Sequence, residues 1–285
     1  MTYKSIYLAL SGDSDAKAAA DAAFVLAKAF DARLVASDTV AEPGPFLDQT
    51  GIGMMATYYD ELYKTAEKVL AHKRSTASDV FEAARQRHDV PLKSAAGASA
   101  TCHWHAHDGD AAIVARLGRL ADVIVLACPG ERGSYADLKT FEQAVFDARR
   151  PIVMVPSGTE LNLDKPAVIA WNGSAEAARA VINAMPLLAK SGRAHVVQVG
   201  ELDADGAELS EAEAYLALYG VKIDTETVKA GKQSVADVIS ARVEKTGAGY
   251  CVMGAYTHNP WRELVLGGMT QHMLKHAGVP MLLAH

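Results

Sequence analysis

An internal repeat constrains the fold of this chain more than any other feature of its sequence. Residues 7–40 begin with an apolar run, pass through a small polar turn into an alanine-rich segment, and end in a second apolar run. Residues 167–201 follow the same order. Two later apolar runs also occur twice, at 120–130 and 247–257, and again at 149–156 and 278–285. The 285-residue chain is therefore predicted to contain two copies of one structural unit.

The apolar runs of each copy are short and hydrophobic on both faces, and helical segments separate them. Such runs are typical of parallel strands that are covered by helices on both sides of a sheet. Each copy is therefore predicted to be an α/β domain, an open parallel-sheet sandwich of about five strands. A polar segment, residues 158–165, precedes Pro166 and is predicted to link domain 1 (residues 1–157) to domain 2 (residues 166–285).

The first copy is longer because it contains the Gly/Pro-bearing segment 42–55 and the stretch that follows it. Apolar residues in that stretch recur at steps of mainly three and four, which predicts an amphipathic helix. They are Tyr59, Leu62, Tyr63, Ala66, Val69, Leu70, Ala77, Val80, Phe81 and Ala84. We expect this stripe to face the core.

Composition excludes several classes of function. The formal net charge of -6 gives no reason to expect a nucleic-acid partner, since such proteins present basic faces. No apolar run approaches the roughly 20 residues that cross a bilayer, and the first residues do not resemble a secretory signal, so a cytoplasmic protein without a membrane partner is expected. Its three cysteines lack CxxC spacing and predict neither a disulfide framework nor a thiolate zinc site.

The order of these segments resembles the universal stress protein family in its tandem form, and the resemblance covers nearly the whole chain. It implies two domains with the fold of the adenine nucleotide alpha hydrolases, packed as an internal pseudo-dimer or forming a homodimer. Family members commonly pair through their last strands, which implies a seam between residues 151–156 and 279–285. The resemblance also implies a stress-response regulator or chaperone-like factor with at most slow ATP hydrolysis.

Family members that bind ATP carry the phosphate motif G-x2-G-x9-G-[S/T] and an aspartate at the end of the first strand. In the second copy Gly254 and Gly267 match the outer glycines, and Thr257 stands at the middle one. Gly268 replaces the hydroxyl residue and Asn172 the aspartate. Glycines let the backbone approach a phosphate, and N–H groups that open a helix point toward an anion. The binding candidates for ATP with Mg²⁺ are Asn172, Gly231, Gly254, Thr257, Gly267, Gly268 and Thr270.

Gly231 enters that set because the resemblance places its loop, like that of Gly109 in the first copy, in the nucleotide cleft. The first copy departs further from the motif. Ala127 replaces the first glycine, Gly130 matches the second, the last two positions hold Thr140 and Phe141, and Ser11 stands for the aspartate. A phenylalanine at the helix opening would obstruct a phosphate, so we do not expect the first copy to bind ATP in the family manner.

The run from Thr101 to Asp110 carries three histidines at alternate positions. In a strand, His103, His105 and His107 share one face, with neighbours about 6.6 Å apart. A neighbouring pair is then able to ligate Zn²⁺, with Asp108 or Asp110 completing the site. The alternative is a polar edge strand whose side chains discourage unwanted pairing.

No nucleophile with its base, acid pair or nicotinamide motif is evident, so no catalytic residue is predicted. Two interpretations stand beside nucleotide binding. The substituted motif also fits a nucleotide-independent interaction or scaffold protein with an unknown protein partner. Alternatively, domain 1 binds a metal ion at the histidine run, or a small molecule under residues 42–55, since long loops often cover functional sites.

Overall fold

The computed structural model describes residues 2–12, 16–40, 56–92, 100–110, 112–128, 135–202, 205–229, 231, 233–255 and 278–285. The strands are β1 (Ser5–Leu10), β2 (Arg33–Asp38), β3 (Thr101–Trp104), β4 (Val123–Ala127), β5 (Ile152–Val155), β6 (Ala167–Trp171), β7 (Arg193–Val199), β8 (Lys222–Val228), β9 (Tyr250–Gly254) and β10 (Met281–Ala284). The helices are α1 (Ala16–Phe30), α3 (Ala56–His88), α4 (Ile113–Gly118), α5 (Tyr135–Glu142), the π-helical η1 (Gln143–Ala148), α6 (Ala175–Ser191), α7 (Leu209–Ala217) and α8 (Val235–Thr246).

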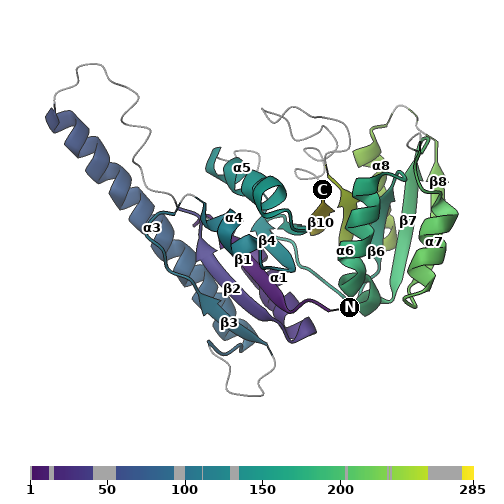
Figure 1. The fold of residues 1–285 in the computed structure, drawn as a ribbon, viewed down its shortest axis with the longest axis horizontal. Helices are drawn as coiled ribbons and strands as arrows, with labels where there is room; N and C mark the ends of the chain where they lie inside the picture. Colours follow the sequence, from purple (N-terminus) through teal and green to yellow (C-terminus); the bar gives the residue numbers. More distant parts are fainter. Residues whose placement is uncertain are drawn as a thin grey trace.

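Ten strands among the described residues form one sheet, in the order β3-β2-β1-β4-β5-β10-β9-β6-β7-β8. Pairing is parallel within each half, as for Ile6 with Leu34 in the first and Val168 with His195 in the second. The second half repeats the strand order of the first in mirror sequence across the centre of the sheet (Figure 1). The predicted fold class, two tandem α/β sandwiches of five strands each, is thereby confirmed.

The two sides of the sheet bury alternate residues of the same strands. In β1, Ile6, Leu8 and Leu10 lie in one core cluster, whereas Tyr7 and Ala9 lie in the other. Helices α1, α3, α6 and α7 cover the first side, and α4, α5 with η1, and α8 cover the second. This double burial explains why the strands read as continuous apolar runs in the sequence.

Capping residues mark the ends of two helices in the second half, α6 and α8. Ser174 caps α6, because its Oγ accepts a hydrogen bond from Ala177 N at 3.2 Å. The helix ends at Gly192, whose φ of 65° is the left-handed conformation that glycine adopts readily. Helix α8 has a capping box of Ser234 and Asp237. These caps fix where each helix leaves the sheet.

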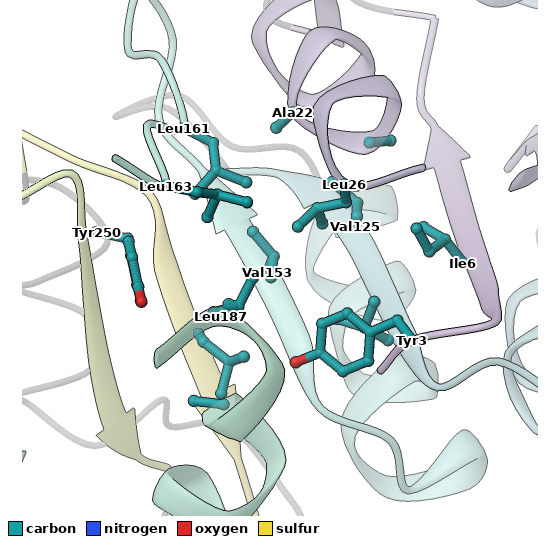
Figure 2. Close-up of a cluster of buried hydrophobic side chains, with 14 of the residues drawn as sticks. Tyr3, Ile6, Ala22, Leu26, Val125, Val153, Leu161, Leu163, Leu187 and Tyr250 are labelled. Atoms are coloured by element: carbon teal, nitrogen blue, oxygen red, sulfur yellow. The ribbon is translucent and has the colours of Figure 1, made fainter. Parts of the chain in front are cut away.

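The halves join through β5 and β10, which pair antiparallel with Val153 opposite Leu282. The seam that the resemblance implied is therefore present. The segment between the halves is exposed at Gly158, Glu160, Asp164 and Lys165. It is anchored by Leu161 and Leu163, which are buried beside Tyr250 and Leu187 in Figure 2. One core cluster thus contains residues of both halves.

Helix α3 departs from expectation. Its C-terminal half packs on α1 and the sheet, where Ala77, Phe81 and Ala84 are buried. Its N-terminal half projects away from the body in Figure 1, and there Leu62 and Val69 are 39% and 52% exposed. The prediction that the whole stripe faces the core was wrong, because the helix is longer than the surface on which it lies.

None of the described helices combines the length and the hydropathy that a membrane span requires.

Candidate functional site

Two of the predicted nucleotide-binding residues lie at neighbouring strand ends of the second half. Asn172 directly follows β6, and Gly254 is the last residue of β9. These strands pair in parallel, with Ala170 opposite Met253, so their carboxyl ends meet at one edge of the sheet. Helix α6 begins three residues after Asn172 at the same edge. In open α/β sheets this edge is the usual place for a ligand.

Asn172 is held in a turn by its own side chain. Its Oδ1 accepts a hydrogen bond from Ser174 N at 3.2 Å, an Asx turn that leads into the α6 cap. Within the described part of the chain, the Asn172 side chain makes no other hydrogen bond. Its amide nitrogen is therefore the group that would serve a ligand, and it is a donor where an aspartate offers only acceptors.

Close packing against α6 requires a glycine at position 254, since no space is left there for a side chain. A Cβ at this position would lie 2.7 Å from Ala177 N and 2.8 Å from Glu176 C in the first turn of α6. Any side chain here would push β9 away from α6. The residue thus brings the end of β9 close to a helix N-terminus, where backbone N–H groups favour an anion.

The β6–α6 turn lies beneath the segment that leads into α7. Gly173 has a φ of 77°, and a Cβ on it would meet Ala207 O at 2.9 Å. Trp171 Nε1 donates to the same Ala207 O at 3.1 Å, and Ala207 N donates to Gly173 O at 3.0 Å. The segment that precedes α7, at Gly206 and Ala207, therefore lies beside Asn172 and forms one side of the candidate site.

Of the five remaining nucleotide-binding candidates, Gly231 lies among the described residues and the other four do not. A Cβ at Gly231 would meet no atom within 4 Å, so local packing does not require this glycine. It follows β8, which is separated from β6 by β7. Thr257, Gly267, Gly268 and Thr270 lie outside the described residues.

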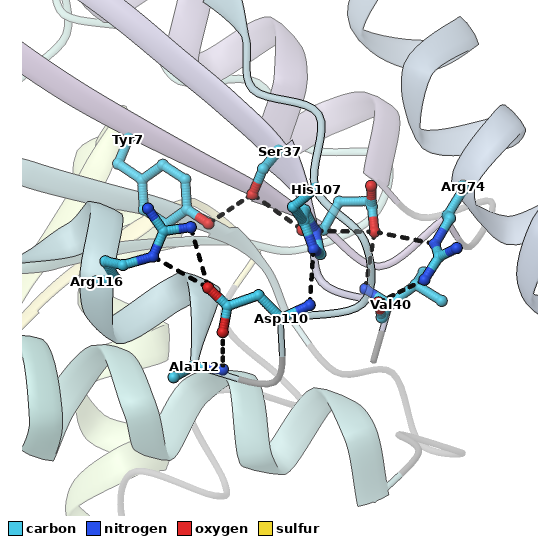
Figure 3. Close-up of polar contacts among 9 residues, drawn as sticks. Tyr7, Ser37, Val40, Arg74, His107, Asp110, Ala112 and Arg116 are labelled. Atoms are coloured by element: carbon cyan, nitrogen blue, oxygen red, sulfur yellow. Dashed lines mark hydrogen bonds and ion pairs between the residues drawn. The ribbon is translucent and has the colours of Figure 1, made fainter. Parts of the chain in front are cut away.

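The corresponding edge of the first half holds a polar network centred on Asp38 and His107 (Figure 3). Asp38 ends β2 and is 4% exposed. Its Oδ1 accepts Val40 N at 3.0 Å and lies 3.2 Å from His107 Nε2, and Arg74 Nε approaches it at 4.0 Å. On the neighbouring strand, Tyr7 Oη is 2.8 Å from Ser37 Oγ.

The hydrogen bonds of His107 determine its tautomer. Asp110 N donates to His107 Nδ1 at 3.0 Å, so this nitrogen carries no proton. Nε2 therefore bears the hydrogen of the neutral ring and donates to Asp38 O at 3.0 Å. Both ring nitrogens are engaged within the protein, and His107 joins the end of β2 to the loop that precedes α4.

Asp110 extends this network to α4. Its carboxylate accepts Ala112 N at 2.9 Å and Arg116 Nε at 3.0 Å, and these contacts lower the pKa of Asp110. Sequence reasoning placed Asp110 beside a metal and did not identify Asp38, Ser37 or Tyr7. An acidic residue at the carboxyl end of a buried strand was the signal for Asp38, because parallel strands gather such ends at one edge.

The structure does not bring the three histidines together as one set of ligands. Strand β3 ends at Trp104, so the strict alternation that would align His103, His105 and His107 stops there. The ring centroids of His103 and His105 are 6.4 Å apart. Both ring nitrogens of His107 already make hydrogen bonds within the protein. The described residues contain no group of three His, Cys, Asp or Glu side chains arranged for a metal.

The first half also differs from expectation at Phe141. This residue is the seventh of α5, not the opening residue of a helix, because α5 already begins at Tyr135. Its side chain is 2% exposed and belongs to the core cluster on that side of the sheet. It therefore does not obstruct the amino end of the helix.

No protein-family model matches the chain. Its sequence is 26% identical over 175 residues to a universal stress protein of Synechocystis sp. (strain ATCC 27184 / PCC 6803 / Kazusa), a match that covers 56% of this chain and 57% of that protein. The match thus spans little more than half the length of this relative.

Solved structures share the fold along nearly the whole chain. A universal stress protein from Archaeoglobus fulgidus DSM 4304 matches with a TM-score of 0.64 and 16% identity, over 98% of this chain and 97% of that one. The cytoplasmic domain of a prokaryotic cation chloride cotransporter matches with a TM-score of 0.53 and 10% identity, over 100% and 95% of the two chains. The chain is therefore similar in part of its sequence to a universal stress protein, and it shares the two-half fold of a solved universal stress protein along nearly its whole length.

Proposed function

We propose that this chain is an adenine-nucleotide-binding regulator whose ligand lies at the carboxyl edge of the second half. The observation that carries the proposal is the meeting of Asn172, Gly254 and the N-terminus of α6 at neighbouring strand ends. A helix N-terminus supplies N–H donors and a partial positive charge, which suit the anionic part of a nucleotide.

Each residue has a role suited to its chemistry. The Asn172 amide nitrogen would donate to a ribose hydroxyl oxygen, while its Oδ1 keeps the turn closed. Gly267 and Gly268 would let backbone N–H groups reach the phosphates, with Mg²⁺ bound to the phosphate oxygens. Gly231, Thr257 and Thr270 complete the proposed set.

The first half is a poorer choice for the same ligand. Most polar groups at its edge are paired with one another, since Val40 N bonds to the Asp38 carboxylate and Arg74 Nη2 lies 3.5 Å from Val40 O. Among the described residues, only the buried Arg74 Nε of this cluster is left without a hydrogen bond. His107 uses both ring nitrogens in the same network. A ligand there would have to break these contacts and leave buried polar groups without partners, which is costly.

Calorimetric titration with ATP and Mg²⁺ tests the proposal. We expect one ATP per chain in the wild type, and binding at least about tenfold weaker in Gly267→Val, because the valine side chain blocks the approach of a phosphate. Gly278→Val is the matched control, since a Cβ at Gly278 meets no atom within 4 Å. Absence of both heat and thermal stabilisation at millimolar ATP would refute nucleotide binding.

Asn172→Asp refines the location. A carboxylate keeps the acceptor for Ser174 N and adds a second acceptor for a ribose hydroxyl, beside a helix N-terminus that favours negative charge. We expect tighter ATP binding by this variant. ATP binding that is unchanged in both Asn172→Asp and Gly267→Val would place the ligand away from this edge.

One observation favours a second function, that of an interaction protein without a nucleotide. The projecting half of α3 exposes Leu62, Tyr63 and Val69, three large apolar side chains on a single helix. Exposed apolar patches commonly mark contact surfaces. Substitutions on this helix that change assembly, in a protein that does not respond to ATP, would support this function.

A further inference from the structure

The imidazole of His107 joins the end of β2 to the turn that leads into α4 (Figure 3). The His107 side chain is 4% exposed, and that of Asp38 is 6% exposed. Nε2 donates to Asp38 O at 3.0 Å, and Nδ1 accepts from Asp110 N at 3.0 Å. Only the neutral imidazole offers one donor and one acceptor. This connection therefore requires His107 to be neutral.

The amino end of α4 is in turn anchored to Asp110. The Asp110 carboxylate accepts Ala112 N at 2.9 Å and Arg116 Nε at 3.0 Å. Between His107 and Asp110 the chain turns through Gly109, whose φ of 72° is left-handed. A change at His107 Nδ1 thus acts directly on the residue that holds the start of α4.

Protonation of His107 has opposite effects on its two contacts. A proton on Nδ1 turns this nitrogen from an acceptor into a donor, so two N–H groups face each other at Asp110 and the hydrogen bond is lost. Nε2 remains a donor, and the positive ring is attracted to the Asp38 carboxylate, whose Oδ1 lies 3.2 Å away. The charged ring therefore keeps its contact with β2 but no longer binds the turn before α4.

The charged groups around the ring come from three other places in the fold. Arg74 on α3 approaches Asp38 Oδ1 at 4.0 Å, and Arg116 Nη2 on α4 lies 3.0 Å from Asp110 Oδ2. Asp108, in the same turn as His107, is exposed. Each of the two carboxylates that flank the ring thus has an arginine beside it.

Two further titratable groups belong to this cluster. Burial raises the pKa of Tyr7 on β1, so its hydroxyl stays neutral. Burial, and then the charges of Arg116, His103 and His107, lower the pKa of His105, which follows β3. Histidine is the side chain that ordinarily changes charge between about pH 5 and pH 8. Acidification in this range therefore acts on the cluster through its histidines.

We propose that His107 is a pH-sensitive switch of the first half. The neutral ring fixes residues 107–110 and the amino end of α4 to the end of β2, and protonation releases them. The sheet itself stays intact, because β3 pairs with β2 through backbone contacts, such as Leu34 with Cys102, that do not involve the ring. Acidification thus loosens the carboxyl edge of the first half without unfolding it. The proposal does not depend on nucleotide binding.

Nuclear magnetic resonance of the ¹⁵N-labelled wild-type chain tests the proposal. The ring nitrogen shifts of His107 report which nitrogen carries a proton, and exchange of the Asp110 amide reports the bond to Nδ1. We expect a proton on Nε2 alone at about pH 7.5. Once the ring is charged, protection of the Asp110 amide should be about fivefold lower or more, relative to the intrinsic exchange rate at each pH. The amides of β4, between β1 and β5, should keep their protection.

A variant separates the charge of His107 from its hydrogen bond. In His107→Asn, the side-chain Oδ1 replaces Nδ1 as an acceptor for Asp110 N and does not titrate. Protection of the Asp110 amide should then be independent of pH between about 7.5 and 5. His103→Asn is the matched control, because His103 is an exposed histidine on β3, and it should keep the pH dependence of the wild type. Circular dichroism confirms that both variants fold.

Three results would overturn the proposal. The first is a His107 ring that stays neutral at pH 5, and the second is an Asp110 amide that keeps its protection after the ring is charged. Both are read from the wild-type chain, so the test stands even where the variant does not fold. The third is a loss of protection that persists in His107→Asn, which would assign the effect to another group.

Discussion

Glu226, in the second half, has a carboxylate whose charge is compensated by basic neighbours on two other elements. It lies on β8, where its carboxylate accepts hydrogen bonds from Arg242 Nε at 2.8 Å and Nη2 at 2.7 Å on α8. His195 Nε2 on β7 lies 3.3 Å away. These contacts, and chiefly the hydrogen bonds from Arg242, hold the pKa of Glu226 at about 2, against an ordinary value of 4.5. The carboxylate therefore ties the edge strand to α8.

This lowered pKa predicts a pH dependence of stability. A group with a depressed folded-state pKa contributes stability above its unfolded-state pKa and loses it as pH falls through the folded value. Glu226→Gln should lower the free energy of unfolding at pH 7 by about 0.5–1 kcal/mol, since the pair is partly exposed to solvent. The difference from wild type should shrink from pH 4.5 to pH 2, as followed by urea unfolding.

The control for this prediction is Glu244→Gln, an exposed glutamate on the same helix α8. Its stability should stay close to wild type at each pH. A gap between Glu226→Gln and wild type that stays constant from pH 6 to pH 2 would show that the carboxylate does not act through its charge.

At this scale the sequence located some groups of the site and missed others. Gly254 was marked by the motif spacing and Asn172 by its position at the end of the first strand of the second copy, and the two lie at neighbouring strand ends. The spacing did not reveal that Gly254 is required by the approach of α6. Asp38 and His107 pair only because β2 and β3 are neighbours, and no linear pattern records that contact.

Helix α3 shows which features of an element a sequence pattern determines, and which depend on the neighbouring elements. The three-and-four spacing predicted the helix and its apolar face correctly. The spacing did not predict how much of that apolar face packs against the rest of the protein, since this depends on the sizes of α1 and the sheet. Strand β3 shows the same limit, because alternation of histidines continues past Trp104 although the strand does not.

The two halves of α3 should respond differently to truncation. Phe81 is 2% exposed and packs on Phe24 and Trp104, with ring centroids 5.6 Å and 5.4 Å away. Phe81→Ala should cost about 3–5 kcal/mol of unfolding free energy because it leaves a cavity. Val69→Ala should change it by less than about 0.5 kcal/mol. Chemical unfolding of the monomer, at low protein concentration, gives both values.

Equal effects of these two substitutions would contradict the described docking of α3. A large effect of Val69→Ala at low concentration would mean that the projecting half is already packed within one chain.

In the whole molecule, the repeat seen in the sequence becomes one continuous sheet. The antiparallel β5–β10 pair joins two parallel halves, and Tyr3 Oη donates to Asn183 O at 2.6 Å across them. Buried residues of both halves share one core cluster. The sequence predicted the seam through resemblance to a family, since periodicity alone does not tell which strands of two domains pair.

This continuity predicts that the two halves unfold together. Leu282 lies at the seam, 1% exposed and opposite Val153. Leu282→Ala should lower the free energy of unfolding by about 2–5 kcal/mol, as large-to-small core substitutions do. Native-state hydrogen exchange, read by mass spectrometry, should show the same loss for the amides of β1 and of β6, because both open only when the shared sheet comes apart. Leu120→Ala is the matched control, because Leu120 is 85% exposed and should alter neither strand. If Leu282→Ala lowers protection in β6 alone, the halves are separately stable domains that merely touch, and the ten-stranded sheet is not a single folding unit.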